Sequence, residues 1–165
     1  MTFPFPQDVF LLAQKIVETC LISGKTLALA ESCTGGLVAS AITSIPGSSS
    51  VLERGFVVYT NIAKQENLDV SPEILRTFTA VSEETARAMA QGTLAHSHAD
   101  FTFSVTGIAG PGGATEGRPV GLVHLCVAGR DGRCVHERHV FPGNREDVRM
   151  AALLRGLKMI QDFMS

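Results

Sequence analysis

TLALAESCTGGLVASAITSI, residues 26–45, combines a strand, a turn and a helix with no linker between them. The apolar run 26–30 is typical of a buried strand, and residues 37–45 carry apolar side chains at helical spacing. The turn between them reads ESCTGG. Glycines allow a ligand to approach the backbone closely, and free amides at the start of a helix attract negative charge. This unit predicts an α/β fold with an anion or nucleophile site after the first strand.

The turn supplies two candidate nucleophiles, Ser32 and Cys33. Thr34, Gly35 and Gly36 are candidate substrate contacts, because their amides would lie at the start of the helix. The alternative is that Ser32 or Thr34 only caps the helix and that the glycines only turn the chain. The stretch by itself leaves both interpretations open.

Composition favours a single domain over residues 1–165, since 45% of the residues are hydrophobic. The net charge is -2 and no block of consecutive Lys or Arg occurs, so we expect neither nucleic acid nor a membrane as a partner. Residues 1–8 carry two prolines and no basic residue, and no apolar run approaches the roughly 20 residues of a membrane span. We therefore expect a cytoplasmic protein, and its apolar character leaves room for a homo-oligomer.

Several metal and cofactor motifs fail in this chain. The four cysteines form no CxxC pair, which disfavours structural zinc and a disulfide framework. SGKT at 23–26 lacks the earlier glycine of a phosphate-binding loop, and Gly110 and Gly112 lack the third glycine of a dinucleotide fingerprint. Strand alternation places Cys134 and His136 on the face opposite His139. We expect no metal and no organic cofactor.

Hydrophobic periodicity along the chain predicts six helical segments and five strands. The helices are expected at 9–23, 37–45, 63–68, from 71 onward, 82–96 and after the N-cap Asn144, and the strands at 26–30, 55–59, 101–106, 120–128 and 134–141. The strand at 55–59 is predicted to be buried, and Asp131-Gly132 predicts a hairpin turn. The order predicts a three-layer α/β/α domain with a mixed, mostly parallel sheet and an antiparallel C-terminal hairpin.

Polar side chains follow three of the predicted strands at the point where each strand ends. They are Ser32 after the first strand, Tyr59, Asn61 and Lys64 after the second, and Thr106 with Gly107 after the third. An open α/β sheet gathers such residues at one edge. If burial lowers the pKa of Lys64, its amine can accept the hydroxyl proton of Ser32, with Tyr59 relaying or orienting. The alternative for Lys64 is a solvated helix lysine.

Two further candidates lie outside this set. Ser48, in the turn 47–50, supplies a rival hydroxyl that either attacks or binds the substrate. Arg145 lies in the first turn of the last helix, where a cation opposes the helix dipole, and this favours a ligand-binding use. The alternative is that Arg145 pairs with Glu146 or Asp147.

Several motifs together resemble the CinA C-terminal family, the nicotinamide-nucleotide amidases, also called nicotinamide mononucleotide deamidases. The matching motifs are AESCTGG at 30–36, PGSS at 46–49, VYTN at 58–61 with Lys64, TGIAGPGG at 106–113, PVG at 119–121 and FPGNR at 141–145. The resemblance covers about residues 8 to 163. Longer members of this family carry the same module after a domain that resembles molybdopterin-binding proteins, so we expect this chain to be a stand-alone amidase.

The resemblance implies hydrolysis of nicotinamide mononucleotide to nicotinic acid mononucleotide and ammonia, a salvage step toward NAD that needs no cofactor. It implies a catalytic set of Ser32, Tyr59, Lys64 and Thr106, and substrate contacts at Thr34, Gly35, Gly36, Ser48, Asn61, Gly107, Gly110, Gly112 and Arg145. The choice between Ser32 and Ser48 as nucleophile stays open, and so does the choice between a covalent intermediate and direct attack by water. Amides of the turn 34–36 or near Gly107 are candidate oxyanion donors.

Two other functions remain possible from the sequence. One is a non-catalytic nucleotide-binding or regulatory module linked to competence or DNA damage, which would bind its ligand without releasing ammonia. The other is a hydrolase of a different amide, which would keep the nucleophile and need no contacts to a nucleotide phosphate.

Overall fold

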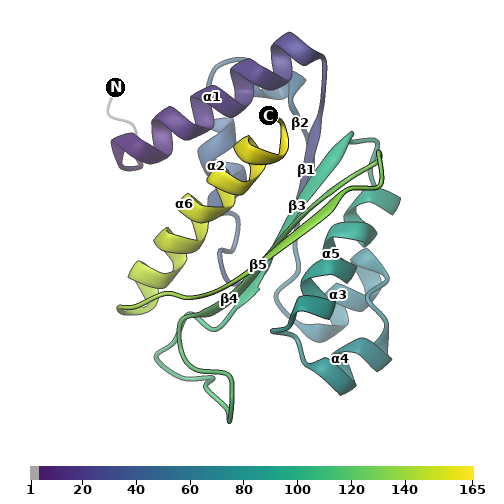
Figure 1. Cartoon of the computed structure of the whole chain (residues 1–165), viewed down its shortest axis with the longest axis vertical. Helices are drawn as coiled ribbons and strands as arrows, with labels where there is room; N and C mark the ends of the chain where they lie inside the picture. Colours follow the sequence, from purple (N-terminus) through teal and green to yellow (C-terminus); the bar gives the residue numbers. More distant parts are fainter. Residues whose placement is uncertain (1–3) are drawn as a thin grey trace.

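The fold is a five-stranded sheet with helices on both faces (Figure 1). The computed structural model describes residues 4–165. The elements in chain order are α1 (Gln7–Ser23), β1 (Leu27–Glu31), α2 (Leu37–Thr43), the short 3-10 helix η1 (Ser48–Ser50), β2 (Leu52–Val57), α3 (Asn61–Leu68), α4 (Pro72–Phe78), α5 (Glu83–Ala95), β3 (Phe101–Gly107), β4 (Leu122–Gly129), β5 (Cys134–Val140) and α6 (Arg145–Phe163). The strand–turn–helix unit of the sequence is therefore β1, its turn and α2.

The strands lie in the order β2-β1-β3-β4-β5. β1 pairs in parallel with both β2 and β3, whereas β4 is antiparallel to β3 and to β5. Four of the five strands thus run in one direction, which confirms the predicted mixed sheet with its antiparallel C-terminal hairpin. Every residue of β1 is buried, because strands flank it on both sides and helices cover both of its faces.

The prediction that the second strand is buried was wrong. β2 begins at Leu52, three residues before the predicted start, and it lies at the edge of the sheet with Gly55 and Val57 exposed. Its apolar residues resemble those of a central strand, but an edge strand has a neighbour on only one side. Val58, which follows β2, is the buried residue of this run.

Two helical layers enclose the sheet (Figure 1). α1, α2 and α6 share one core with the sheet, whereas α3, α4 and α5 cover the other face. Asn144 caps α6 as predicted, because its side chain accepts from the N–H of Asp147 and the Asp147 carboxylate accepts from the N–H of Asn144. This capping box fixes the first turn of α6, which carries Arg145, at the lower end of the sheet in Figure 1.

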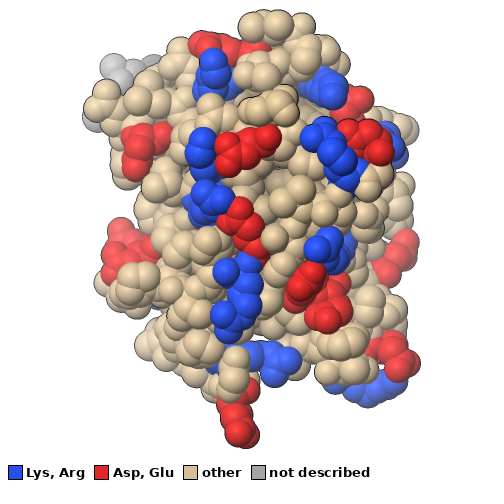
Figure 2. All heavy atoms as spheres, viewed as in Figure 1, with Lys and Arg blue, Asp and Glu red and all other residues tan. Residues whose placement is uncertain are grey.

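Charges of both signs are interspersed on the face of the molecule shown in Figure 2. Ion pairs of the described residues include Arg155 with Glu137 and Lys158 with Asp162. Among residues 4–165, no helix has both the length and the apolar character that crossing a bilayer requires.

α3 packs against α5 at Gly92, where a side chain would not fit. A Cβ built at this position would lie 2.0 Å from the carbonyl oxygen of Leu68, the last residue of α3. Alanine usually stabilises a helix by about 1 kcal/mol relative to glycine. Here we expect Gly92→Ala to lower the free energy of unfolding by about 3 kcal/mol, because α3 must move away. Urea denaturation measures this change.

Gly112→Ala is the matched control for Gly92→Ala. A Cβ at Gly112 would have no atom within 4 Å, and its backbone is outside the left-handed region. We expect this variant to change the free energy of unfolding by less than about 0.5 kcal/mol. Equal stability of the two variants would contradict the close packing of α3 on α5.

Candidate active site

A cavity of about 230 Å³ lies at the carboxyl ends of β1, β2 and β3. It is lined by Ser32, Cys33, Tyr59, Lys64, Ala80, Val81, Thr106, Gly107, Ile108, Ala109, Gly110, Gly112, Gly113 and Arg145. The four residues predicted to form the catalytic set are all among them. The convergence expected for polar residues at the ends of parallel strands is therefore present in the structure.

Lys64 and Ser32 are in direct contact inside this cavity. The Lys64 amine lies 3.2 Å from the Ser32 hydroxyl and donates to the carbonyl of Val58 at 3.0 Å. Lys64 is 1% exposed, and no carboxylate within residues 4–165 forms an ion pair with it. Burial lowers the pKa of Lys64, because the charged ammonium loses its hydration. The geometry is that of a serine paired with a lysine able to act as a base.

Cys33, the other candidate nucleophile, lies in a different environment. Its thiol is buried, and burial raises the pKa of Cys33 to about 12. The thiol therefore stays protonated near neutral pH, where the thiolate would be the reactive form. Gly107 packs beside it, since a Cβ at Gly107 would lie 3.2 Å from Cys33 Sγ and 2.7 Å from a Val123 methyl group. The raised pKa of the Cys33 thiol and the contact of Ser32 with the Lys64 amine together favour Ser32 over Cys33 as the nucleophile.

Arg145 bridges two walls of the cavity. Its guanidinium donates to the hydroxyl of Tyr59 at 2.8 Å and to the carbonyl of Gly110 at 2.8 Å. The alternative of an ion pair with Glu146 or Asp147 is not what the structure shows. The charge of Arg145 therefore has only neutral partners among the described residues, which leaves it available to an anionic ligand.

Thr106 connects the cavity to the loop before α5. Its buried hydroxyl donates to the carbonyl of Ala80 at 2.7 Å, and the hydroxyl oxygen can still accept a hydrogen bond. Ala80 and Val81 line the cavity, and the sequence reasoning missed both. Small apolar residues in a loop carry no chemical signal by which to identify them.

The first turn of α2 does not offer the free amides that we expected. The Glu31 carboxylate accepts from the N–H groups of Val38 and Ala39, at 2.9 and 3.0 Å, and from the Thr34 hydroxyl at 2.7 Å. These amides therefore bind the side chain of Glu31, where we expected them to be free for an anionic ligand. Sequence reasoning also missed this role of Glu31, although a lone acid at the end of an apolar strand was a usable signal.

Five predicted substrate contacts do not line the cavity: Thr34, Gly35, Gly36, Ser48 and Asn61. The first three follow Ser32 in the turn, and the Thr34 hydroxyl is bound to Glu31. Asn61 is exposed at the first position of α3.

Ser48, which the sequence offers as a rival hydroxyl, does not line this cavity. Ser48 is buried in η1, which precedes β2 and therefore lies at the amino end of that strand. The next residues confirm this placement, because the carbonyl of Val51 accepts from the N–H of Leu27 at the start of β1. Ser32, by contrast, follows the carboxyl end of β1.

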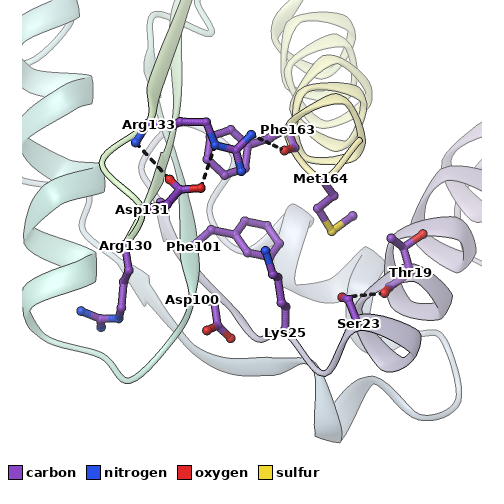
Figure 3. A pocket seen from close by; sticks show the side chains of 11 residues that line it. Thr19, Ser23, Lys25, Asp100, Phe101, Arg130, Asp131, Arg133, Phe163 and Met164 are labelled. Atoms are coloured by element: carbon purple, nitrogen blue, oxygen red, sulfur yellow. Dashed lines mark hydrogen bonds and ion pairs between the residues drawn. The ribbon is translucent and has the colours of Figure 1, made fainter.

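A second cavity, of about 220 Å³, lies at the opposite end of the sheet, between the ends of α1 and α6 (Figure 3). Some of its polar groups bind one another, whereas Arg130 and Asp100 bind residues outside its lining. Arg133 donates to the Asp131 carboxylate and to the carbonyl of Phe163, and the Ser23 hydroxyl donates to the carbonyl of Thr19. None of the predicted site residues lines it. The cavity at the carboxyl ends of the strands is therefore the candidate active site.

Comparison with known sequences gives one family and two kinds of relative. The model of the CinA C-terminal domain matches residues 10–164. A protein named nicotinamide-nucleotide amidohydrolase PncC, from Enterobacter agglomerans, is 48% identical over 147 residues, which cover 89% of this chain and 90% of that protein. A CinA-like protein from Chlorobium phaeovibrioides is 56% identical over 119 residues, which cover 72% of this chain. The chain spans 28 to 36% of the length of this and four other longer curated relatives.

Solved structures show the same fold. The competence/damage inducible protein CihA from Agrobacterium tumefaciens aligns over 100% of both chains, with a TM-score of 0.97 and 45% identity. A competence-damaged protein (CinA) superfamily protein from Escherichia coli aligns over 99% of this chain and 94% of its own, with a TM-score of 0.89 and 30% identity.

Proposed function

Because this chain belongs to the CinA C-terminal domain family, we propose that it is an amidase that hydrolyses nicotinamide mononucleotide to nicotinic acid mononucleotide and ammonia. The observation that carries the proposal is the contact between the Lys64 amine and the Ser32 hydroxyl in a cavity at the sheet edge. The relative named nicotinamide-nucleotide amidohydrolase supports the choice of substrate.

In the proposed mechanism, the neutral amine of Lys64 accepts the proton of the Ser32 hydroxyl while Ser32 Oγ attacks the carboxamide carbon. The amides of Cys33 and Thr34, the next two residues, are the candidate donors to the oxyanion. The Lys64 ammonium then protonates the departing nitrogen, and ammonia leaves. Water hydrolyses the resulting ester with Lys64 again as the base, which releases the carboxylate product and restores the Ser32 hydroxyl.

Arg145 is the proposed partner of the nucleotide phosphate. A guanidinium binds phosphate with two parallel hydrogen bonds, and Arg145 presents its charge at the cavity wall. The same residue lines a neighbouring hollow, together with Pro111, Gly143 and Asn144. This hollow, which Glu146 also lines, is the proposed place of the ribose phosphate, outside the cavity that holds Ser32 and Lys64. Tyr59, Thr106 and the glycine-rich loop with Gly107, Gly110 and Gly112 complete the proposed site.

Ammonia release from three related amides tests the proposal. We expect turnover of nicotinamide mononucleotide, and at least about tenfold lower kcat/KM for nicotinamide riboside and for nicotinamide, because neither carries the phosphate that Arg145 binds. No ammonia from the mononucleotide would contradict the proposal and favour a binding module. Equal rates on all three would favour a hydrolase of another amide.

A single amidase domain over residues 1–165, a cytoplasmic location and a homo-oligomeric state remain predictions of the sequence.

A further inference from the structure

Arg149 contacts the turn that carries Ser32 from a distant part of the chain. It lies on α6, one helical turn after Arg145. Its Nε donates to the carbonyl of Cys33 at 3.1 Å, and its Nη2 donates to the carbonyl of Thr34 at 3.0 Å. The chain separates these partners by 116 and 115 residues, so only the tertiary fold brings them together.

These two hydrogen bonds fix two successive peptide planes. A peptide is planar and trans, so its N–H points away from its own C=O. The guanidinium holds the carbonyl of Cys33, and this orients the N–H of Thr34 to the opposite side. It also holds the carbonyl of Thr34, which orients the N–H of Gly35, and that N–H donates to the carbonyl of Ser32 at 3.0 Å. The orientation of the peptide between Cys33 and Thr34, and with it the direction of the Thr34 N–H, therefore depends on Arg149.

Other bonds fix the turn on its remaining sides. The N–H of Ser32 donates to the carbonyl of Val105 in β3, and the Thr34 hydroxyl donates to Glu31. Among the described residues only Arg149 binds the carbonyl of Cys33, whereas the carbonyl of Thr34 also accepts from the N–H of Leu37 at 3.2 Å. An arginine suits this position, because its donors form a rigid fork that reaches two adjacent acceptors, whereas a lysine presents a single mobile ammonium.

We propose that Arg149 is a positioning residue that holds the Ser32 turn in the orientation required for attack and for donation of the Thr34 amide to the oxyanion. This inference rests on the proposed amidase function. A small displacement of a nucleophile or oxyanion donor lowers the rate of the chemical step more than it lowers the affinity for substrate. Loss of Arg149 therefore reduces kcat and leaves KM nearly unchanged.

The test compares Arg149→Met and Arg149→Lys with Arg155→Met as the matched control. Arg155 lies on the same helix and its guanidinium binds the Glu137 carboxylate, away from the cavity. We expect Arg149→Met to lower kcat for nicotinamide mononucleotide by about 30-fold with KM within about threefold. Arg149→Lys should lower kcat by about tenfold, because it keeps the charge and loses the fork. Arg155→Met should stay within about twofold of the wild type.

Hydrogen exchange of the peptide that contains residues 32–36 provides a readout without substrate. We expect faster exchange in Arg149→Met than in the wild type or Arg155→Met, while the exchange of the β strands stays the same. Unchanged exchange in this peptide overturns the proposal, and so does unchanged kcat in a variant whose turn exchanges faster. A wild type that is inactive on the mononucleotide contradicts the proposed function instead, and the exchange result then decides the role of Arg149.

Discussion

Replacing Lys64 with methionine is expected to lower kcat for nicotinamide mononucleotide by about a thousandfold or more and to leave the folded protein at least as stable as the wild type. Loss of activity follows because the Ser32 hydroxyl loses the amine 3.2 Å away, the base that would activate it. Stability is retained because Lys64 is 1% exposed and has no carboxylate partner within residues 4–165, so its charge costs free energy on folding. If the activity were lost because the protein unfolds, the free energy of unfolding would fall together with kcat.

The pH dependence adds a second readout of the same prediction. The amine must be neutral to act as a base, so the wild-type kcat should rise with pH through the pKa of Lys64, which burial places below its ordinary value of 10.5. Between that lowered pKa and 10.5 the unfolded chain binds a proton that the folded chain has lost, so the stability of the wild type rises with pH in this window. The stability advantage of Lys64→Met should therefore be largest at lower pH and shrink as the pH rises.

Steady-state kinetics and urea denaturation at several pH values measure both effects. Lys64→Arg is the matched control, because it keeps a cation that cannot act as a base at these pH values. We expect it to be inactive like Lys64→Met and less stable than Lys64→Met. Activity of Lys64→Met within tenfold of the wild type would contradict the role of Lys64 as the base.

Replacing Ser32 with alanine should reduce ammonia release from nicotinamide mononucleotide to background, a loss of about 10⁴-fold or more. The substitution removes the hydroxyl that contacts Lys64, while Ser32 is 7% exposed and alanine fits its space. The expected result includes an unchanged circular dichroism spectrum. In the wild type, mass spectrometry after rapid acid quenching should detect the nucleotide acyl group on Ser32.

Ser48→Ala is the internal comparison for this experiment, because Ser48 is also a buried serine in a turn. Its position at the amino end of β2 predicts a kcat within about threefold of the wild type. Full loss of activity in Ser48→Ala with retention in Ser32→Ala would transfer the nucleophile to Ser48 and contradict the site described above. Retained activity in both variants would favour direct attack by water.

The sequence predicted which residues gather at this cavity wherever a rule about strand ends applied. Ser32 and Tyr59 follow the parallel strands β1 and β2, and Thr106 is the second-last residue of β3. Parallel strands place their carboxyl ends at one edge. The burial of Lys64 could not be predicted in the same way, because it depends on how α3 packs against β1 and α5. Ser48 precedes β2. The rule selects only residues that follow a strand, so applying it strictly would have excluded Ser48 from the site.

Backbone partners explain the residues that the sequence did not reveal. Arg149 binds two carbonyls, and every residue has a carbonyl, so no pattern of side chains indicates the contact. Glu31 likewise binds two amides of α2. The edge position of β2 was missed because a short apolar run has the same composition at the edge and in the centre of a sheet.

The close approach of Gly92 to Leu68 links the packing of α3 on α5 to the proposed activity. The proposed base and the proposed nucleophile lie on separate segments, and we expect α3 to bring Lys64 to Ser32 only while its last residue rests on α5. If α3 opens locally, Lys64 returns to water and regains an ordinary affinity for protons, although the sheet remains intact. The fraction of molecules with α3 closed is then an upper limit on the fraction that can turn over substrate. Conditions that shift this local equilibrium therefore change the rate of the reaction without changing the binding of the substrate to the closed form.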